Sequence, residues 1–180
     1  MAKQYDALTE NLSTFILQQK IFFVATATAD SRVNLSPKGM DSLRILSPNR
    51  VAWLNVTGSG NESAAHVKVN PRMTILFAAF EGNPLILRLY GQAKVVHPRD
   101  AEWAELAQHF TLLPGSRQIF DVNIEMVQRS CGMAVPFFDY QGEREQLSDW
   151  ATRNGEEGTR EYWEKTNQLS IDGLPTGIFE

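Results

Sequence analysis

The chain has 180 residues, a formal net charge of −4 and a pI of about 5.4, so it lacks the basic balance that general nucleic-acid binding requires. Hydrophobic residues make up 43% and charged residues 21%, which is typical of a globular protein, and we expect one domain over residues 1–180. With no membrane-length apolar run, no signal-peptide pattern and a single cysteine, the sequence predicts a cytoplasmic protein without disulfides or membrane contact.

The first half of the sequence predicts a helix and then a series of strands. Residues 4–19 place apolar side chains at spacings of three and four, as an amphipathic helix does. Alternating or continuous apolar runs then predict strands, the first two of which form a hairpin. The predicted strands cover residues 21–28, 32–36, 43–46, 51–56, 73–80, 85–96 and 118–130.

A glycine-rich loop and a short helix follow the strand that contains Trp53, within the segment WLNVTGSGNESAAHVKVNP. Gly58 and Gly60 allow a tight turn, and Ser59 or Asn61 can cap the helix. Free backbone N–H groups at a helix N-terminus can bind an anion. We therefore consider two interpretations, a phosphate-binding loop and an ordinary strand-to-helix turn.

The remaining helices are predicted over residues 97–109 and in two segments of the charged tail after residue 141. Short strands with helices at the start, middle and end indicate a mainly β (α+β) fold, a closed or nearly closed antiparallel barrel with peripheral helices. We place the barrel at about residues 20–130 and a helical C-terminal extension at about residues 141–180.

Several isolated residues are assigned structural rather than chemical roles. The three histidines do not have metal-ligand spacing, so no metal site is expected. Cys131, in an apolar stretch, is expected to be a buried small hydrophobe, and His66 a solvent or interface residue. The aromatic side chains expected to pack on helices are Trp103, Trp150 and Trp163.

The order and spacing of several segments resembles the pyridoxamine 5'-phosphate oxidase-like family of FMN-binding split barrels. These segments are the first helix, the hairpin FFVATATADSRVNLSPKG, the run NPRMTILF and the strand LRLYG, and the resemblance covers residues 5–130. The tail segments SCGMAVPFF and SIDGLPTG are similar to an uncharacterised branch of that family. The resemblance implies a six-stranded split β-barrel that forms a homodimer with FMN at the subunit interface.

The resemblance also implies a set of cofactor-binding residues. In the family, the second barrel strand and the loop after the next long strand hold the FMN phosphate, and a further strand borders the flavin. The positions carried over are Asn34, Ser36 and Lys38 on the first element, Thr57, Ser59, Asn61, Glu62 and Ser63 on the second, and Arg88 on the third. Without the resemblance, Lys38 would be a surface lysine, and Ser59 and Asn61 would be ordinary helix caps. Arg88 would require an internal acidic partner.

The chain departs from the family at the phosphate loop, where Glu62-Ser63 replaces an Arg-Lys pair. A carboxylate cannot clamp a dianion, so the positive charge must come from Lys38, Arg32, Arg88 or a partner subunit. Glu62 itself would interact with a ribityl hydroxyl or with the helix dipole. The tail also lacks the basic and histidine residues that hold the vitamin substrate in true pyridoxamine oxidases, so pyridoxal phosphate synthesis is not expected.

The function implied is an FMN-dependent oxidoreductase that acts on a small organic substrate, with NADH or NADPH as a candidate electron donor. No acid–base residue stands out as catalytic, which agrees with redox chemistry carried by the cofactor. The alternative is a flavin- or haem-binding protein without turnover, serving as a carrier or sensor.

Overall fold

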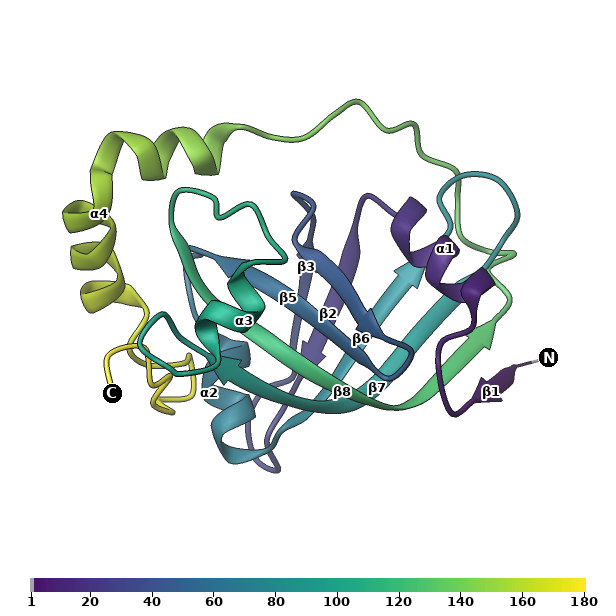
Figure 1. Ribbon diagram of the computed structural model, residues 1–180, viewed down its shortest axis with the longest axis horizontal. Helices are drawn as coiled ribbons and strands as arrows, with labels where there is room; N and C mark the ends of the chain where they lie inside the picture. The colour runs from purple at the N-terminus through teal and green to yellow at the C-terminus, as the bar shows by residue number, and fades with distance from the viewer. Residues whose placement is uncertain (1) are drawn as a thin grey trace.

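The structure is a computed structural model that describes residues 2–180, and its centre is a strongly curved antiparallel sheet (Figure 1). The strands are β1 (Lys3–Tyr5), β2 (Phe22–Thr26), β3 (Asn34–Lys38), β4 (Leu43–Ser47), β5 (Arg50–Val56), β6 (Arg72–Ala78), β7 (Ile86–Val96) and β8 (Ser116–Ser130). The helices are α1 (Glu10–Gln18), α2 (Glu62–Val69), α3 (Trp103–Ala107) and α4 (Gln146–Thr166).

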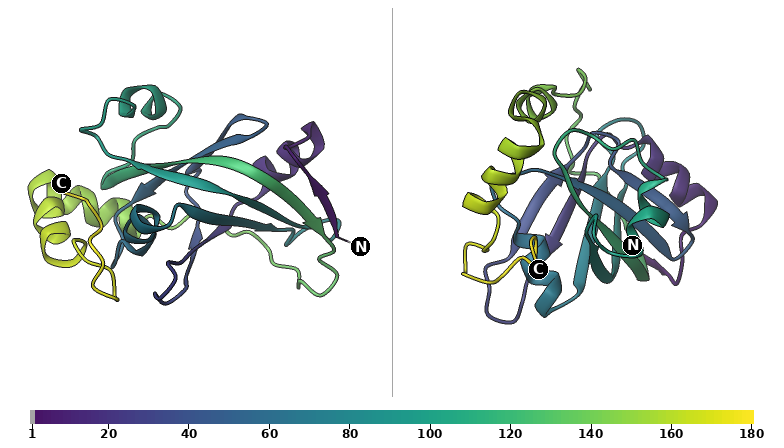
Figure 2. Two further views of the ribbon diagram at one scale, coloured as in Figure 1. Left: turned by 90° about the horizontal axis from the view of Figure 1, so that it is seen from below. Right: turned by 60° about the vertical axis from the view of Figure 1, so that its left-hand side comes forward.

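The strand order is β3-β2-β6-β7-β8-β5-β4, and β1 adds to β8. All pairs are antiparallel, and β3 and β4 are the two ends of the path. This confirms the predicted mainly β barrel with peripheral helices, although the sheet has eight strands where the resemblance implied six. The helices and the C-terminal extension lie around the outside of the curved sheet (Figure 2).

Strand β5 is buried on both faces, which fixes the strand that leads into the glycine-rich loop. On one face Trp53 stacks on Phe120, with ring centroids 4.5 Å apart, and meets Phe22 edge-on at 6.2 Å. On the other face Leu54 packs in a second cluster with Leu106 of α3. Because alternate residues of a strand point to opposite faces, the sequence alternation places Trp53 and Leu54 in different cores.

The N-terminal helix is shorter than predicted. It begins at Glu10, after Thr9, whose Oγ1 accepts the Leu12 backbone N–H at 3.4 Å. Residues Lys3–Tyr5 form β1 instead, pairing with the end of β8. The prediction of a helix from residue 4 was wrong because residues 3–5 pair with a sheet edge and Thr9 caps the helix, which therefore begins later.

The middle helix is also shorter than the predicted span of residues 97–109. Only Trp103–Ala107 is α-helical, because Asp100 Oδ2 accepts the His97 backbone N–H at 2.7 Å and closes a turn at the start. In the tail, α4 contains a kink at Gly155, which has φ 64° and ψ −174°. The two helical segments predicted in the tail therefore correspond to the parts of α4 on either side of this kink.

Two residue-level predictions were wrong. Cys131 is exposed, because β8 ends at Ser130 and the chain leaves the sheet at the cysteine. His66 is fully buried rather than exposed, since the face of α2 that carries it packs on the sheet. Its Nδ1 lies 3.1 Å from Thr26 Oγ1 of β2.

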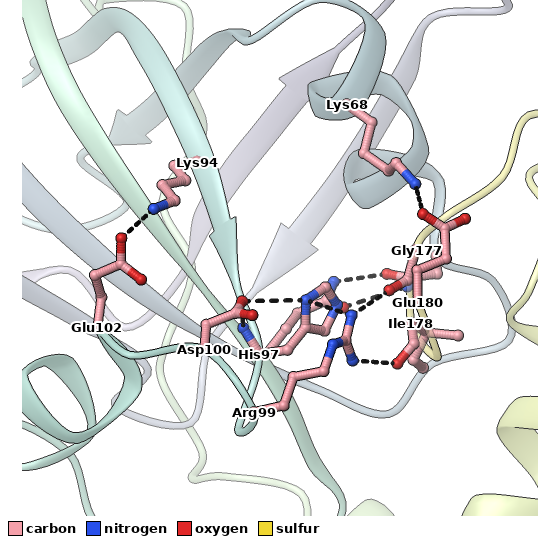
Figure 3. Close-up of polar contacts among 11 residues, drawn as sticks. Lys68, Lys94, His97, Arg99, Asp100, Glu102, Gly177, Ile178 and Glu180 are labelled. Atoms are coloured by element: carbon pink, nitrogen blue, oxygen red, sulfur yellow. Dashed lines mark hydrogen bonds and ion pairs between the residues drawn. The ribbon is translucent and has the colours of Figure 1, made fainter.

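The end of the chain is fixed against the barrel next to α2. Arg99 donates hydrogen bonds to the backbone oxygens of Gly177 (2.6 Å) and Ile178 (2.8 Å). Lys68 of α2 forms an ion pair with Glu180 (Figure 3). These contacts hold the C-terminal segment beside the helix that follows the glycine-rich loop.

None of the helices in residues 2–180 has both the length and the apolar character needed to cross a membrane.

Candidate functional site

A cavity of about 830 Å³ lies between β3, the end of β5, the loop at residues 57–61 and the C-terminal segment 169–171, and we call it the inner cavity. Its volume is within the range of roughly 300–1,000 Å³ that is usual for small-molecule sites. Eight residues predicted from the sequence line it together: Asn34, Ser36, Lys38, Thr57, Ser59, Asn61, Glu62 and Ser63.

Arg88 is the predicted site residue that lies apart from this group. It lines neither the inner cavity nor the neighbouring groove described below. Its Nη1 donates to Ser130 Oγ at 3.1 Å, across the β7–β8 pair. Among residues 2–180, Arg88 forms no ion pair, so the acidic partner that the sequence alone required is not observed.

Lys38 brings a positive charge into the inner cavity from the end of β3. Its Nζ lies 5.3 Å from the ring centroid of Trp53, a distance that allows a cation–π contact. Burial lowers the pKa of the Lys38 ammonium from 10.5 to about 8, and the charge of Arg117 contributes to this shift. The ammonium is therefore poorly solvated and is stabilised by any anion that enters the cavity.

Arg117 is the functional candidate that sequence reasoning missed. It lies at the start of β8, lines the inner cavity and is only 4% exposed. Its guanidinium donates to Asn55 Oδ1 (2.7 and 3.2 Å), to the Gly60 backbone oxygen (3.1 Å) and to Asn167 Oδ1. Burial lowers the pKa of Arg117 to about 9, and the group stays protonated at neutral pH.

Neither of these two cations has a carboxylate partner. In residues 2–180 the eight ion pairs join other side chains, and neither Lys38 nor Arg117 is among them. A buried charge is normally paired, because leaving water costs free energy that only a counter-charge or strong hydrogen bonds offset. Neutral hydrogen-bond acceptors offset part of this cost for Arg117, and two cations without carboxylate partners in one cavity are suited to an anion.

A group of short polar side chains also lines the inner cavity. Asn34 Nδ2 donates to Ser63 Oγ at 3.0 Å, and Ser36 Oγ donates to Asn34 Oδ1 at 3.1 Å. Ser63 Oγ also accepts from Thr26 at 3.3 Å. These groups tie β3 to the start of α2 and present amide and hydroxyl groups to the cavity.

The glycine-rich loop is held by side chains from distant parts of the chain. Thr57 Oγ1 donates to the Gly115 backbone oxygen (2.9 Å) and accepts from Trp163 Nε1 (2.9 Å). Asn61 is at the N-cap position of α2 but makes no capping bond, because its amide is paired with Gln118 at 2.7 and 3.3 Å. The helix N–H groups at this end are consequently not satisfied by a side-chain cap.

Glu62 faces the C-terminal segment. Its two carboxylate oxygens each lie 3.1 Å from the backbone nitrogen of Ile171, whose N–H they accept. One residue further on, Asp172 forms an ion pair with Arg32 and accepts its backbone N–H at 2.8 Å. We call these two contacts the C-terminal clasp. The first of these contacts engages the Glu62 carboxylate, which conflicts with a phosphate loop when the sequence is read alone.

A second depression of about 1,470 Å³ adjoins the inner cavity, and we call it the outer groove. It lies between the end of α1, β2, the loop at residues 80–82 and the segment 138–147 that arches from β8 to α4 (Figure 1). Residues 37–40 and Leu147 line both spaces, so the two share this wall. Within residues 2–180, no group of three or more His, Cys, Asp or Glu side chains could hold a metal ion.

Comparison with known proteins establishes the family of this split barrel. Residues 8–131 match the family described as pyridoxamine 5'-phosphate oxidase. The protein ustO of Aspergillus flavus, described as a pyridoxamine 5'-phosphate oxidase family protein, is 33% identical over 191 residues, covering 95% of this chain and 76% of ustO. The chain therefore belongs to the pyridoxamine 5'-phosphate oxidase family, as its sequence pattern suggested.

Solved structures agree on the fold. A candidate pyridoxamine 5'-phosphate oxidase from Lactobacillus delbrueckii is 24% identical, with a TM-score of 0.54 over 68% of this chain and 94% of that one. HupZ from Group A Streptococcus is 20% identical, with a TM-score of 0.52 over 66% of this chain and 91% of that one. At these identities the likeness concerns the fold alone.

Proposed function

We propose that the protein is an FMN-dependent oxidoreductase that acts on a small organic substrate, with FMN held in the inner cavity. The observation that carries this proposal is the pair of buried cations without carboxylate partners, Lys38 and Arg117, in a cavity of ligand size. Family membership supports a flavin as the anionic occupant. In this proposal the barrel and its helical extension act together as one cofactor-binding domain over residues 1–180.

The residues present fit a phosphate-bearing cofactor. Arg117 and Lys38 would supply the positive charge, and the uncapped start of α2 would add backbone N–H donors. Ser59 and Ser63 would offer hydroxyl donors to the phosphate, while Asn34 and Ser36 would bind the ribityl chain along β3. Bound FMN would supply the redox chemistry, and these side chains would orient it and exclude water.

The same lining favours FMN over haem. Haem iron is usually held by a histidine, cysteine, tyrosine or methionine side chain. Among the described residues that line the inner cavity, Met40 is the single side chain of those types, and histidine and cysteine are absent. The strongest donors in the cavity are cationic and hydroxyl groups, which are ligands for phosphate rather than for iron.

We further propose that the protein works as a homodimer with the cofactor near the subunit interface. Strand β3 lies at an end of the sheet path, and its side chains reach the inner cavity on one face. Leu35 is exposed on the other face, and Val33, which precedes the strand and also borders the inner cavity, is exposed as well. An apolar, unpaired edge of this kind is a favourable surface for a second subunit. A V33K/L35K variant that sediments as the wild type does would contradict this interface.

A direct test is titration of the apo-protein with FMN, followed by quenching of flavin fluorescence. We expect FMN to bind stoichiometrically and riboflavin, which lacks the phosphate, to bind much more weakly. Equal affinity for FMN and riboflavin would contradict the phosphate site, and preferential uptake of haem would support the alternative function.

Turnover is tested separately with the FMN-loaded protein. Anaerobic mixing with NADH or NADPH is expected to bleach the flavin absorbance, and an added electron acceptor is expected to restore it. Tight FMN binding without reduction by either nucleotide would instead support a carrier or sensor.

A further inference from the structure

The outer groove has a wall that is not part of the barrel. Its far side is the segment at residues 138–147, which leaves the end of β8 and leads into α4. The segment is attached by a hydrogen bond from the Phe138 backbone N–H to the Phe80 backbone oxygen at 3.1 Å. The rings of the same two residues meet edge-on, with centroids 5.4 Å apart. The wall therefore depends on aromatic contacts as well as on backbone pairing.

Aromatic side chains line the groove from three directions. Phe23 comes from β2, Phe80 from the loop after β6, and Phe138 and Tyr140 from the arching segment. Tyr140 is oriented by the hydrogen bond it donates to Glu143 Oε1 at 2.8 Å. Rings on several sides of a depression are suited to a flat aromatic ligand, which can make stacked and edge-on contacts with them.

The charges around the groove are balanced. Three basic and three acidic side chains line it: Lys20, Lys38, Arg144, Glu81, Asp139 and Glu143. The ammonium of Lys20 lies 5.7 Å from the Tyr140 ring centroid, so one of the three basic groups already faces an aromatic ring. Without Lys38, which the proposed function assigns to the cofactor phosphate, two basic and three acidic side chains remain, so the lining gives little advantage to an anionic or cationic ligand. The groove is consequently suited to an uncharged molecule.

Met40 lies where the groove and the inner cavity meet, since it lines both. Met40 and Asp41 both have left-handed backbones, with φ 62° and 51°. Arg44 holds this turn through the Asp41 backbone oxygen (2.9 Å) and both carboxylate oxygens (2.8 and 2.9 Å). Strained non-glycine backbone persists only where its surroundings enforce it, and a methionine adapts well to aromatic surfaces.

We propose that the outer groove is the substrate site, that its substrate is a flat, uncharged aromatic molecule, and that Met40 contacts this molecule at the junction with the cofactor. The inference rests on the proposed function, because it takes the inner cavity as the flavin site. Phe138 forms the aromatic wall, and Met40 faces the bound ring where the two spaces join.

The test uses Nile red, an uncharged planar dye whose fluorescence rises in apolar surroundings, titrated into the purified protein with and without FMN. The chain offers two matched pairs of variants. Phe138 lines the groove and is 60% exposed, whereas the adjacent Phe137 is 79% exposed and lies outside it. Met40 lines the groove, whereas Met133 is 82% exposed and does not.

We expect Phe138→Ala and Met40→Ala each to weaken dye binding at least fivefold, and Phe137→Ala and Met133→Ala to change it less than twofold. Equal effects within both pairs would overturn the proposal, as would the absence of dye binding by the wild-type protein. Sedimentation of each variant is measured in parallel. Loss of a dimer on Phe138→Ala would mean that a second copy occupies the groove, and would also overturn it.

The two proposals fail in different ways. A protein that binds the dye through Phe138 but takes up no FMN would contradict the cofactor assignment and leave the groove as an aromatic site. A protein that binds FMN through Lys38 but shows no difference between Phe138→Ala and Phe137→Ala would retain the cofactor assignment and lose this inference.

Discussion

Burial and, to a smaller extent, the charge of Arg117 lower the pKa of Lys38, and these two cations line one cavity. Burial is the larger cause for Lys38 and the main cause for Arg117, whose pKa falls to about 9. An anion placed between them would relieve both the repulsion and the poor solvation. This relationship, more than the glycine-rich loop, supports the phosphate position in the proposed function.

Replacing Lys38 with methionine should weaken FMN binding by about 10- to 100-fold, since a hydrogen bond to a charged group contributes about 1.5–3 kcal/mol. The dissociation constant is measured by quenching of flavin fluorescence. Lys94→Met, which removes an exposed lysine that does not line the cavity, controls for the change in net charge. Equal affinity in the two variants would exclude Lys38 from the site.

The affinity for FMN should depend on pH through the same ammonium group. In the free protein Lys38 has a pKa of about 8, and a bound dianion favours its charged form. Raising the pH above about 8 removes the proton from the free protein, so binding should weaken progressively between about pH 8 and 9.5. The phosphate is already dianionic above about pH 7 and contributes little to this change. Lys38→Met should lose the part of the pH dependence that begins near pH 8 and keep the part that comes from Arg117, whose pKa is about 9. A wild-type profile that is flat over this range would contradict the assignment.

The barrel and the loop side of the site were predictable because their signals are local. Strand alternation around Trp53 and the short polar residues after it lie within a few positions in the sequence. Arg117 could not be found in this way, because Asn55 and Asn167 are 62 and 50 positions away and only the fold unites them. A lone arginine just after Pro114-Gly115 gave no signal beyond a loop.

Glu62 illustrates the same limit from the opposite direction. Near an expected phosphate, its carboxylate conflicted with the proposed site, and no neighbouring residue explained it. The explanation is the backbone N–H of Ile171, 109 positions later. The local sequence also led to a wrong prediction for His66, which was expected at the surface and is buried. Its burial depends on which face of α2 packs on the sheet, and the local sequence does not show this.

The C-terminal clasp should slow release of the cofactor. Asp172 pairs with Arg32, and its pKa is lowered chiefly by the hydrogen bond from the Arg32 backbone N–H. Asp172→Ala removes the ion pair with Arg32 and the hydrogen bond from its backbone N–H, and leaves the segment that borders the inner cavity held by the Glu62–Ile171 contact. We expect the FMN dissociation rate, measured by stopped-flow displacement, to rise about 2- to 10-fold, in keeping with one exposed ion pair and one hydrogen bond.

The matched control for the clasp is Glu102→Ala, which breaks the exposed ion pair with Lys94 (Figure 3). It removes an acidic side chain without touching the cavity lining. Its dissociation rate should equal that of the wild type. If the two variants release FMN at the same rate, the clasp does not restrain the cofactor.

His97 should make the fold less stable in mild acid. Burial lowers its pKa below 6.5, and the charge of Arg99 adds to the effect, although Asp100 opposes it. Between this lowered pKa and 6.5 the unfolded chain binds more protons, so the free energy of unfolding falls as the pH drops below about 6.5, by at most about 1.4 kcal/mol per pH unit. Urea unfolding from about pH 7.5 to 5.5 should show a shallower slope in His97→Gln. A slope identical to that of the wild type would contradict this role.

Gly115 joins the stability of the fold to the geometry of the site. It has φ +76°, and an added Cβ would lie 3.0 Å from Thr57 Oγ1 and 3.1 Å from Ala151 Cβ. Its backbone oxygen accepts both the N–H and the hydroxyl of Thr57 at 2.9 Å, so any shift there moves the glycine-rich loop. Gly115→Ala should therefore lower the free energy of unfolding by about 2–4 kcal/mol and weaken FMN binding as well.

Gly82 separates the two causes of that effect. It has a similar φ of +67°, but an added Cβ would meet no described atom within 4 Å. Gly82→Ala should cost only the backbone strain, about 1–2 kcal/mol, and should leave FMN affinity unchanged. Thermal unfolding and FMN titration of both variants provide the comparison. If Gly115→Ala is no more destabilising than Gly82→Ala and binds FMN equally well, the contact between Gly115 and Thr57 does not position the loop.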